Sequence, residues 1–152
     1  MLKLFDWANV IPVTSDGQVV FVKQYRHGTS QVTLEIPGGI MDGEDRDPMW
    51  AAERELFEET GYKAQELILI GKHHPNPALQ DNTCYTYLAL NAKQIASPSF
   101  DKEGYEQIDV CLMPLSAIPK LIADGDITHG TVITAFYYLA LYEKNNSVIS
   151  TS

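Results

Sequence analysis

The chain has 152 residues, 45% of them hydrophobic and 20% charged, with a formal net charge of −9 at pH 7. This length and composition indicate one folded domain with a substantial apolar core, and they exclude a disordered chain. Because a surface of this charge repels phosphate backbones, the composition argues against a nucleic-acid-binding protein, although a bound cation would still let a small anionic substrate approach.

The sequence carries no signal for export or membrane insertion. The first ten residues, MLKLFDWANV, lack the apolar core of a signal peptide, and no apolar run approaches the roughly 18 residues of a membrane-spanning helix. Cys84 and Cys111 each lie within an apolar run, which is typical of buried free thiols in a reducing compartment. We therefore expect a cytoplasmic protein that has no membrane partner.

The first part of the chain predicts β-structure. Residues 4–13 and 19–26 are apolar and β-prone, and the turn signal at 15–17 between them predicts a hairpin. A further short strand is expected at 32–36. The Pro-Gly-Gly sequence at 37–39 is expected to end regular structure there.

An acidic helix is predicted at 48–60, with Asp47 as its N-cap and Gly61 as its terminator. Glu55 and Glu59 lie four residues apart and therefore on one face. Like charges at this spacing destabilise an isolated helix by roughly 0.2–0.5 kcal/mol per pair. A divalent cation, which binds carboxylate oxygens, is the simplest way to offset this repulsion.

The second half of the chain predicts strands at 67–74, 84–90 and 105–113 and helices at 116–125 and 128–145. Ser116 and Thr128 are the candidate N-caps of these two helices. The order of strands, helix, strands and helices indicates an α+β fold with a mixed sheet between helices. We expect a single domain over residues 1–145, followed by a flexible tail at 146–152.

The acidic stretch has simpler interpretations than a metal site. It could be an ordinary solvated helix face. The acidic residues at 42–47 do not follow the ligand spacing of an EF-hand calcium loop. Gly38 and Gly39 lack the lysine and the spacing of a P-loop, so they give only a weak indication of phosphate binding.

From Arg54 the chain reads RELFEETGY, preceded by Gly38 and Glu44. This combination resembles the Nudix box, G-x5-E-x7-R-E-U-x-E-E-x-G-U, in which U is apolar. Every fixed position from the arginine onward matches, and Tyr62 stands where the pattern has an aliphatic residue. Five residues separate Gly38 from Glu44, as in the pattern, but nine rather than seven separate Glu44 from Arg54. We therefore expect a two-residue insertion around Asp45–Asp47.

The resemblance implies the Nudix fold, an α/β/α sandwich around a mixed β-sheet, and divalent-metal-dependent hydrolysis of a nucleoside diphosphate linked to another group. Mg²⁺ or Mn²⁺ would neutralise the phosphates and lower the pKa of a water molecule. Arg54 and Glu44 would orient the ligands. The implied ligands are Glu55 and Glu59, Glu58 as a further or alternating ligand, and a backbone carbonyl of Gly38 or Gly39.

Two other stretches resemble the ADP-ribose and nucleoside-diphosphate-sugar pyrophosphatase branch of this family. QYRHGTSQVTLEIPGG at 24–39 is similar to the branch's QYR followed by LE-P-x-G, which implies that Arg26 and Glu35 bind substrate; a surface salt bridge is the alternative. Pro77 lies sixteen residues after Gly61, a spacing that marks the ADP-ribose branch and implies a substrate-side loop. A merely rigid loop is the alternative for Pro77.

Members of the branch take a late catalytic glutamate from the chain that follows the long connection. Glu103 and Glu106 lie there, and EQIDV is similar to the family's E-x-I-E-V, which favours Glu106. The sequence leaves the general base open among these two and Glu58. Structural or substrate-contact roles are expected for the histidines, which a hard cation disfavours as ligands: His73, His74 and His129.

The resemblance thus implies that the substrate is ADP-ribose or a related nucleoside diphosphate sugar, and that the products are a nucleoside monophosphate and a sugar phosphate. It also implies a homodimer. One alternative is a Nudix hydrolase of nucleoside triphosphates or dinucleoside polyphosphates. Another is a non-catalytic nucleotide-binding module, although the intact set of Glu55, Glu58 and Glu59 argues against that.

Overall fold

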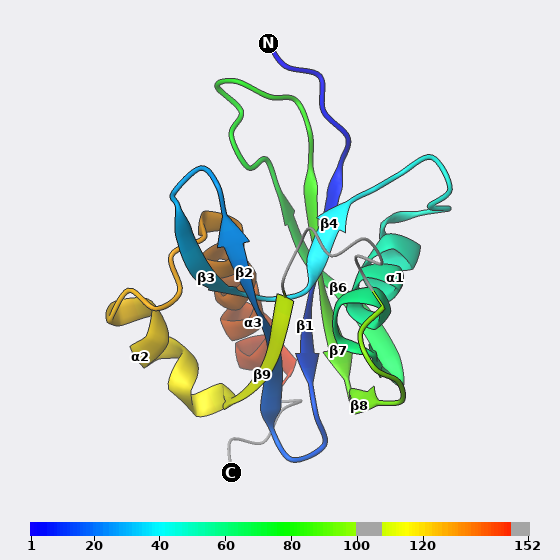
Figure 1. Cartoon of the computed structure of the whole chain (residues 1–152), viewed down its shortest axis with the longest axis vertical. Helices are drawn as coiled ribbons and strands as arrows, with labels where there is room; N and C mark the ends of the chain where they lie inside the picture. The colour runs from blue at the N-terminus through cyan, green and yellow to red at the C-terminus, as the bar shows by residue number, and fades with distance from the viewer. Residues whose placement is uncertain (100–107, 147–152) are drawn as a thin grey trace.

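The computed structural model describes residues 1–99 and 108–146, and Figure 1 shows how its elements are arranged. The strands are β1 (Trp7–Val13), β2 (Gln18–Arg26), β3 (Gln31–Glu35), β4 (Gly38–Ile40), β5 (Tyr62–Lys63), β6 (Glu66–His73), β7 (Cys84–Leu90), β8 (Lys93–Gln94) and β9 (Ile108–Pro114). The helices are α1 (Pro48–Thr60), the 3-10 turn η1 (Leu115–Ala117), α2 (Ile118–Ala123) and α3 (Gly130–Asn146).

Seven of the described strands form one mixed sheet with the path β3-β2-β1-β7-β6. β1 and β7 run parallel at its centre, whereas β1 pairs with β2 antiparallel only where Val13 faces Val19. Toward its N-terminal end β1 pairs instead with β4, and β9 pairs with β2. β1 and β2 therefore diverge, and β4 lies at the point of divergence.

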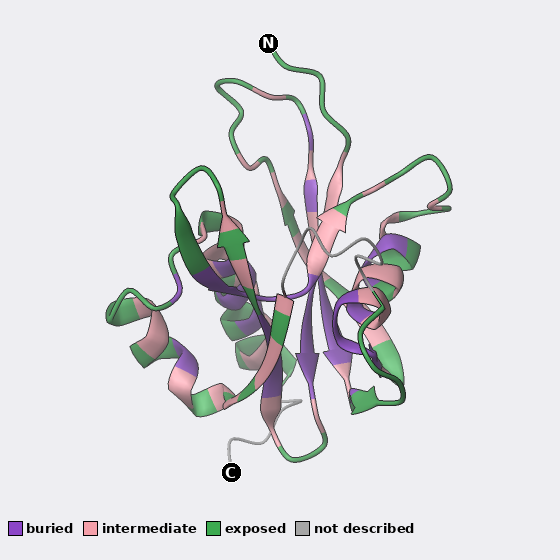
Figure 2. Cartoon of the chain, viewed as in Figure 1, coloured by how far each residue is buried: buried purple, intermediate pink, exposed green. Residues whose placement is uncertain are grey.

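Helices cover both faces of this sheet. The α1 face holds a buried cluster that includes Val10, Val20 and Leu56, and the α3 face holds a second cluster that includes Ile11 and Phe136. Figure 2 shows the buried residues concentrated in the central strands between the two helical layers. This arrangement confirms the predicted α+β class and the α/β/α sandwich.

Helix α1 begins and ends where the local signals predict. The Asp47 carboxylate accepts a 2.8 Å hydrogen bond from the Trp50 amide, and Pro48 occupies the first turn. Gly61 adopts φ 74°, a left-handed conformation, and its N–H donates to the Phe57 carbonyl at 2.8 Å. These caps fix the register of the acidic face relative to the sheet.

The predicted break at 37–39 is confirmed only in part: Ile36 and Pro37 separate β3 from β4, but Gly38 and Gly39 belong to β4. Gly38 pairs with Asn9 and Gly39 with Ala8 of β1. A Cβ at Gly38 would lie 2.7 Å from the Ala8 carbonyl oxygen, closer than side-chain atoms approach. The glycines therefore permit a close backbone approach within the sheet.

Two predicted helix caps are also corrected. Ser116 lies inside η1, and α2 follows it without a side-chain cap. The segment predicted from residue 128 is helical, as expected, but α3 begins at Gly130 and His129 takes the capping position expected of Thr128. None of the described helices has the length and apolar character needed to cross a membrane.

Candidate functional site

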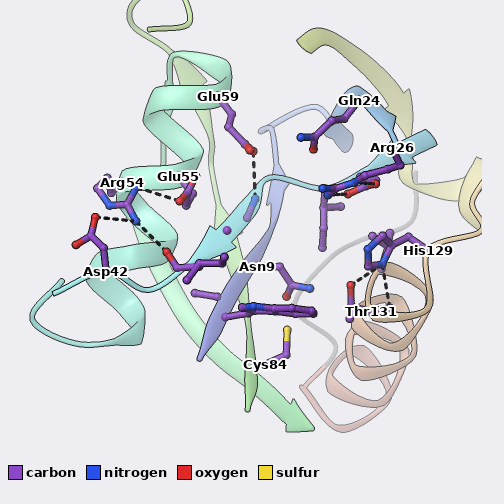
Figure 3. A pocket seen from close by; sticks show the side chains of 18 residues that line it. Asn9, Gln24, Arg26, Asp42, Arg54, Glu55, Glu59, Cys84, His129 and Thr131 are labelled. Carbon is purple, nitrogen blue, oxygen red and sulfur yellow. Dashed lines mark hydrogen bonds and ion pairs between the residues drawn. The ribbon is translucent and has the colours of Figure 1, made fainter. Parts of the chain in front are cut away.

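A cavity of about 530 Å³, here called the main cavity, lies where β1 and β2 diverge. Its walls come from the sheet, from α1 and from the start of α3, and Figure 3 shows α1 and α3 contributing side chains from opposite sides. The lining residues are Trp7, Ala8, Asn9, Gln24, Arg26, Glu35, Ile36, Gly38, Gly39, Ile40, Asp42, Arg54, Glu55, Glu59, Cys84, His129, Thr131 and Val132.

The α1 side of the main cavity is acidic. Glu55 and Glu59 both face it, and Glu59 is only 7% exposed. The Gly38 amide donates to Glu59 Oε2 at 3.1 Å, which ties α1 to β4. A Cβ at Gly39 would collide with the Glu55 carboxylate, so the glycine leaves the space that this carboxylate occupies.

Burial makes the charged forms of these two carboxylates unfavourable. It is the largest cause of the raised pKa of Glu55, which the neighbouring charge of Glu58 raises further and Arg54 opposes. Burial, followed by repulsion from Glu55, raises the pKa of Glu59 to about 8. A buried carboxylate, Glu59, and a partly buried one, Glu55, thus lie on one wall with too little positive charge from the protein around them.

Arg54 is the centre of a carboxylate cluster. It makes a bidentate contact with Asp45, through Nε to Oδ1 at 2.9 Å and Nη2 to Oδ2 at 3.0 Å. Its Nη1 donates to Glu55 Oε1 at 3.0 Å and to Glu58 Oε2 at 3.2 Å. The Asp45 hydrogen bonds are the largest cause that raises the pKa of Arg54, so the guanidinium stays charged and holds Glu55 in place.

The position expected of Glu44 is taken by Asp45. The Asp42 carboxylate accepts from the amides of Glu44 at 2.8 Å and Asp45 at 3.2 Å, and the Asp45 carboxylate accepts from the Asp42 amide. This turn directs Asp45 toward Arg54 and leaves Glu44 exposed. The irregular spacing before the helix therefore changes which carboxylate meets the arginine.

Arg26 and Glu35 form a second ion pair on the wall made by β2 and β3. Arg26 donates from Nε to Oε1 at 2.7 Å and from Nη2 to Oε2 at 2.5 Å. The Thr33 hydroxyl donates to Glu35 Oε1 at 2.6 Å. Burial alone would raise the pKa of Glu35, but the hydrogen bonds from Arg26 and Thr33 outweigh it and lower that pKa. Arg26 and Glu35, expected from the sequence to bind substrate, thus form the ion pair that was the alternative, and this pair lines the main cavity.

The wall between β1 and α3 contains His129, which was expected to have a structural or substrate-contact role, together with Asn9, Cys84 and Thr131, which the sequence did not assign to the site. Trp7, Asn9 and Cys84 come from neighbouring strands, and His129 and Thr131 come from the start of α3. Burial raises the pKa of Cys84 to about 12, so its thiol is neutral. The alternating apolar pattern of the strands gave no signal for Asn9, whose role depends on the sheet register.

The remaining predicted residues lie elsewhere. Glu58 accepts a hydrogen bond from Arg54 but does not line the main cavity, and its side chain is 41% exposed. Pro77 does not line it either; it lies in the connection between β6 and β7, which bonds to the N-terminal segment through the Leu2 amide and the Leu79 carbonyl. Glu103 and Glu106 lie outside the described residues.

The acidic wall fits a divalent cation by the nature of its donors. Within residues 1–99 and 108–146, no three His, Cys, Asp or Glu side chains already converge as a metal-binding group. Glu55 and Glu59 nevertheless face one cavity beside the β4 backbone, with the space beside Gly39 filled by a carboxylate. Carboxylate and carbonyl oxygens are the ligands that Mg²⁺ and Mn²⁺ prefer.

The chain is similar to known proteins in both sequence and fold. A family model described as NUDIX domain matches residues 5–136. The chain is 29% identical over 134 residues to the ADP-ribose pyrophosphatase of Bacillus subtilis (strain 168), covering 88% of this chain and 71% of that protein. It is 30% identical over 136 residues to the methanol dehydrogenase activator of Bacillus methanolicus, with the same coverage. A solved structure described as an ADP compounds hydrolase aligns with a TM-score of 0.81 at 21% identity, covering 95% of this chain and 75% of that one, which shows a shared fold.

Proposed function

The chain belongs to the NUDIX family, and we propose that it hydrolyses the pyrophosphate bond of ADP-ribose or a related nucleoside diphosphate sugar. The products would be a nucleoside monophosphate and a sugar phosphate. The observation that carries this proposal is that the buried carboxylate of Glu59 and the partly buried carboxylate of Glu55 line the same cavity as Arg26. The similarity to a protein named ADP-ribose pyrophosphatase supports the choice of substrate.

We propose that Glu55 and Glu59 hold Mg²⁺ or Mn²⁺ together with a backbone carbonyl of Gly38 or Gly39. A divalent cation supplies charge neutralisation of the pyrophosphate and a water molecule of lowered pKa. Glu58 would act as a further ligand after leaving Arg54, which it contacts at 3.2 Å. Arg54 holds Glu55, and Asp45 holds Arg54, so this chain of contacts orients the ligands.

Arg26 is proposed to bind the substrate. Its guanidinium is held in a bidentate contact by Glu35, which is only 4% exposed, and this contact fixes its orientation at the cavity wall. We propose Glu106 as the general base that takes the proton from the attacking water, with Glu103 and Glu58 as the alternatives. Pro77 is proposed to shape a loop on the substrate side.

We also propose a cytoplasmic homodimer. The free thiols of Cys84, which is buried, and Cys111, which is half-buried, support a reducing compartment. Exposed apolar side chains beside the β6–β7 connection support an additional contact surface, because Leu2, Phe5 and Leu79 are each more than half exposed.

A substrate panel tests the proposal. We expect purified protein with Mg²⁺ or Mn²⁺ to release AMP and ribose 5-phosphate from ADP-ribose, and to lose this activity when the metal is chelated. Release of free pyrophosphate from nucleoside triphosphates, with no AMP from ADP-ribose, would replace the proposal with a triphosphate hydrolase. Tight binding of a panel member without turnover would indicate a nucleotide sensor instead.

A further inference from the structure

One buried polar atom on the wall of the main cavity has no hydrogen-bond partner among the described residues. Asn9 is only 7% exposed, lines the cavity, and its Oδ1 is buried and unpaired. Figure 3 shows its amide directed toward the part of the cavity that holds His129 and Thr131. A buried amide oxygen without a partner costs free energy, and a ligand that donates a hydrogen bond removes that cost.

The sheet register places Asn9 beside the acidic wall. Asn9 pairs with Gly38 across the β1–β4 ladder, and the Gly38 amide binds Glu59 at 3.1 Å. Neighbouring strands lie roughly 5 Å apart. A Cβ at Gly38 would lie 2.8 Å from the Asn9 Cβ, so the glycine also leaves room for the Asn9 side chain.

His129 adds a second hydrogen-bonding group to this part of the cavity. The Thr131 backbone N–H donates to His129 Nδ1 at 3.3 Å, and the Thr131 hydroxyl lies 2.8 Å from the same nitrogen. Because a backbone N–H can only donate, Nδ1 accepts and the neutral ring carries its proton on Nε2. The ring can therefore offer an Nε2–H donor to a ligand.

The residues of β1 and β7 around Asn9 supply no carboxylate to this wall, although Glu35 faces His129. The other members of this wall are Trp7 and Cys84, and burial keeps the Cys84 thiol neutral. An amide oxygen that accepts and an imidazole N–H that donates suit hydroxyl groups, which do both. A phosphate, which only accepts at neutral pH, would leave Asn9 Oδ1 unpaired.

We infer that Asn9 and His129 form a subsite for the hydroxyl groups of a ribose attached to the pyrophosphate. This inference rests on the proposed function. With the phosphates at Glu55 and Glu59, a ribose is the nearest neutral group on either side, because the base is joined to the pyrophosphate only through a ribose. Asn9 would thus contribute to recognition of a ribose hydroxyl beside the pyrophosphate.

Substitution of Asn9 tests the subsite with analogues of ADP-ribose that each lack one ribose hydroxyl. In the wild-type protein we expect one analogue to lose about tenfold or more in kcat/KM, because it leaves Asn9 Oδ1 unpaired. In Asn9→Ala the loss of kcat/KM for that analogue should shrink to less than about threefold. The position of the hydroxyl that this analogue lacks then identifies which of the two riboses Asn9 contacts. An unchanged preference in Asn9→Ala would overturn the inference.

Two controls separate recognition from stability. Thr86→Val removes another buried, unpaired oxygen from the strand position that pairs with Asn9, but Thr86 does not line the cavity, so its hydroxyl preference should equal that of the wild type. Competition between ribose 5-phosphate and 2-deoxyribose 5-phosphate measures binding without turnover. If Asn9→Ala does not fold, Asn9→Ser provides the same comparison with a smaller cavity.

Recognition of the nucleotide base by Asn9 is the outcome that would contradict a sugar subsite. If Asn9→Ala changed the preference between ADP-ribose and its guanine counterpart while leaving the hydroxyl preference intact, Asn9 would contact the base and the sugar subsite would be wrong. Failure of the whole protein to cleave any member of the panel would instead contradict the proposed function. The two failures are therefore distinguishable.

Discussion

The main cavity contains two arginine–carboxylate clusters that differ in charge balance. Arg26 holds the Glu35 carboxylate with two hydrogen bonds, and its charge also lowers the pKa of Glu59. Arg54 is shared among Asp45, Glu55 and Glu58, while Glu59 lies on the same side of the cavity and receives the Gly38 amide. Among the described residues, negative charge therefore exceeds positive charge at α1, whereas at β2 the guanidinium of Arg26 compensates the charge of Glu35.

The two clusters shift the pKa values of their glutamates in opposite directions. Burial acts on Glu35, Glu55 and Glu59 alike, yet Arg26 and Thr33 lower the pKa of Glu35, whereas the pKa values of Glu55 and Glu59 are raised. The guanidinium of Arg26 thus favours the charged form of Glu35. An unbalanced cluster has capacity for a cation, which agrees with the position expected from the family motif.

Neutralising one member of the unbalanced cluster should have the largest effect on activity. Glu59→Gln keeps the shape of the side chain but removes a proposed metal ligand. We expect kcat/KM for ADP-ribose to fall at least ~100-fold, because even residues that only support metal ligands contribute 10–100-fold. Mg²⁺ should also raise the thermal unfolding temperature of the wild type but not of Glu59→Gln.

The matched control for this variant is Glu53→Gln. Glu53 lies on the same helix but is exposed and does not line the main cavity. Its substitution should leave both kcat/KM and the Mg²⁺ response close to those of the wild type. Near-normal turnover in Glu59→Gln would show that the charge imbalance at α1 has no role in metal binding.

A smaller effect is expected when the geometry of this cluster is disturbed without a change of charge. In Gly39→Ala the new methyl group collides with the Glu55 carboxylate, which must then move. A shift of about 1 Å at a reacting centre can reduce the rate about 100-fold, so a loss between about 10-fold and 100-fold in kcat/KM is expected.

Gly43→Ala provides the comparison for Gly39→Ala. A Cβ at Gly43 meets no atom within 4 Å, and its backbone does not require a positive φ. Its activity should therefore match that of the wild type. Equal activity of the two alanine variants would mean that the Glu55 carboxylate can move without consequence.

The parts of the fold that sequence predicts well are those governed by local chemistry. Asp47, Pro48 and Gly61 fix the ends of α1 through contacts within a few residues, and the structure confirms that helix. The spacing of Glu55 and Glu59 likewise follows from helical periodicity and places both at one cavity. These predictions required no knowledge of distant contacts.

The parts that sequence could not predict depend on contacts across the sheet or within an irregular loop. Asp45 rather than Glu44 meets Arg54 because the Asp42 turn redirects the chain, and residue spacing alone does not encode that turn. Asn9 lines the cavity because β1 leaves β2 and pairs with β4. A two-residue alternation identifies which residues share a face, but it does not identify where two strands diverge.

The smallest expected effect concerns the balanced cluster and is one of stability. In the wild type, Glu35 has a lowered pKa, so the pair stabilises the fold above the ordinary carboxyl pKa, and this contribution is lost as pH falls through the folded-state value. The groups that face Glu35 are Arg26, Thr33, His129 and, across the cavity, Glu59. In Arg26→Gln the burial of Glu35 is no longer opposed by the guanidinium, so its folded-state pKa should rise.

Arg26→Gln should therefore lower the free energy of unfolding by about 1.5–3 kcal/mol at pH 7, the range for a hydrogen bond to a charged group, and by less at pH 4. Urea unfolding at the two pH values measures this difference. Lys23→Gln removes the same charge from an exposed position of β2 and should show neither effect. A destabilisation by Arg26→Gln that is the same at pH 4 and pH 7 would mean that Arg26 stabilises the wall by packing and not by balancing Glu35.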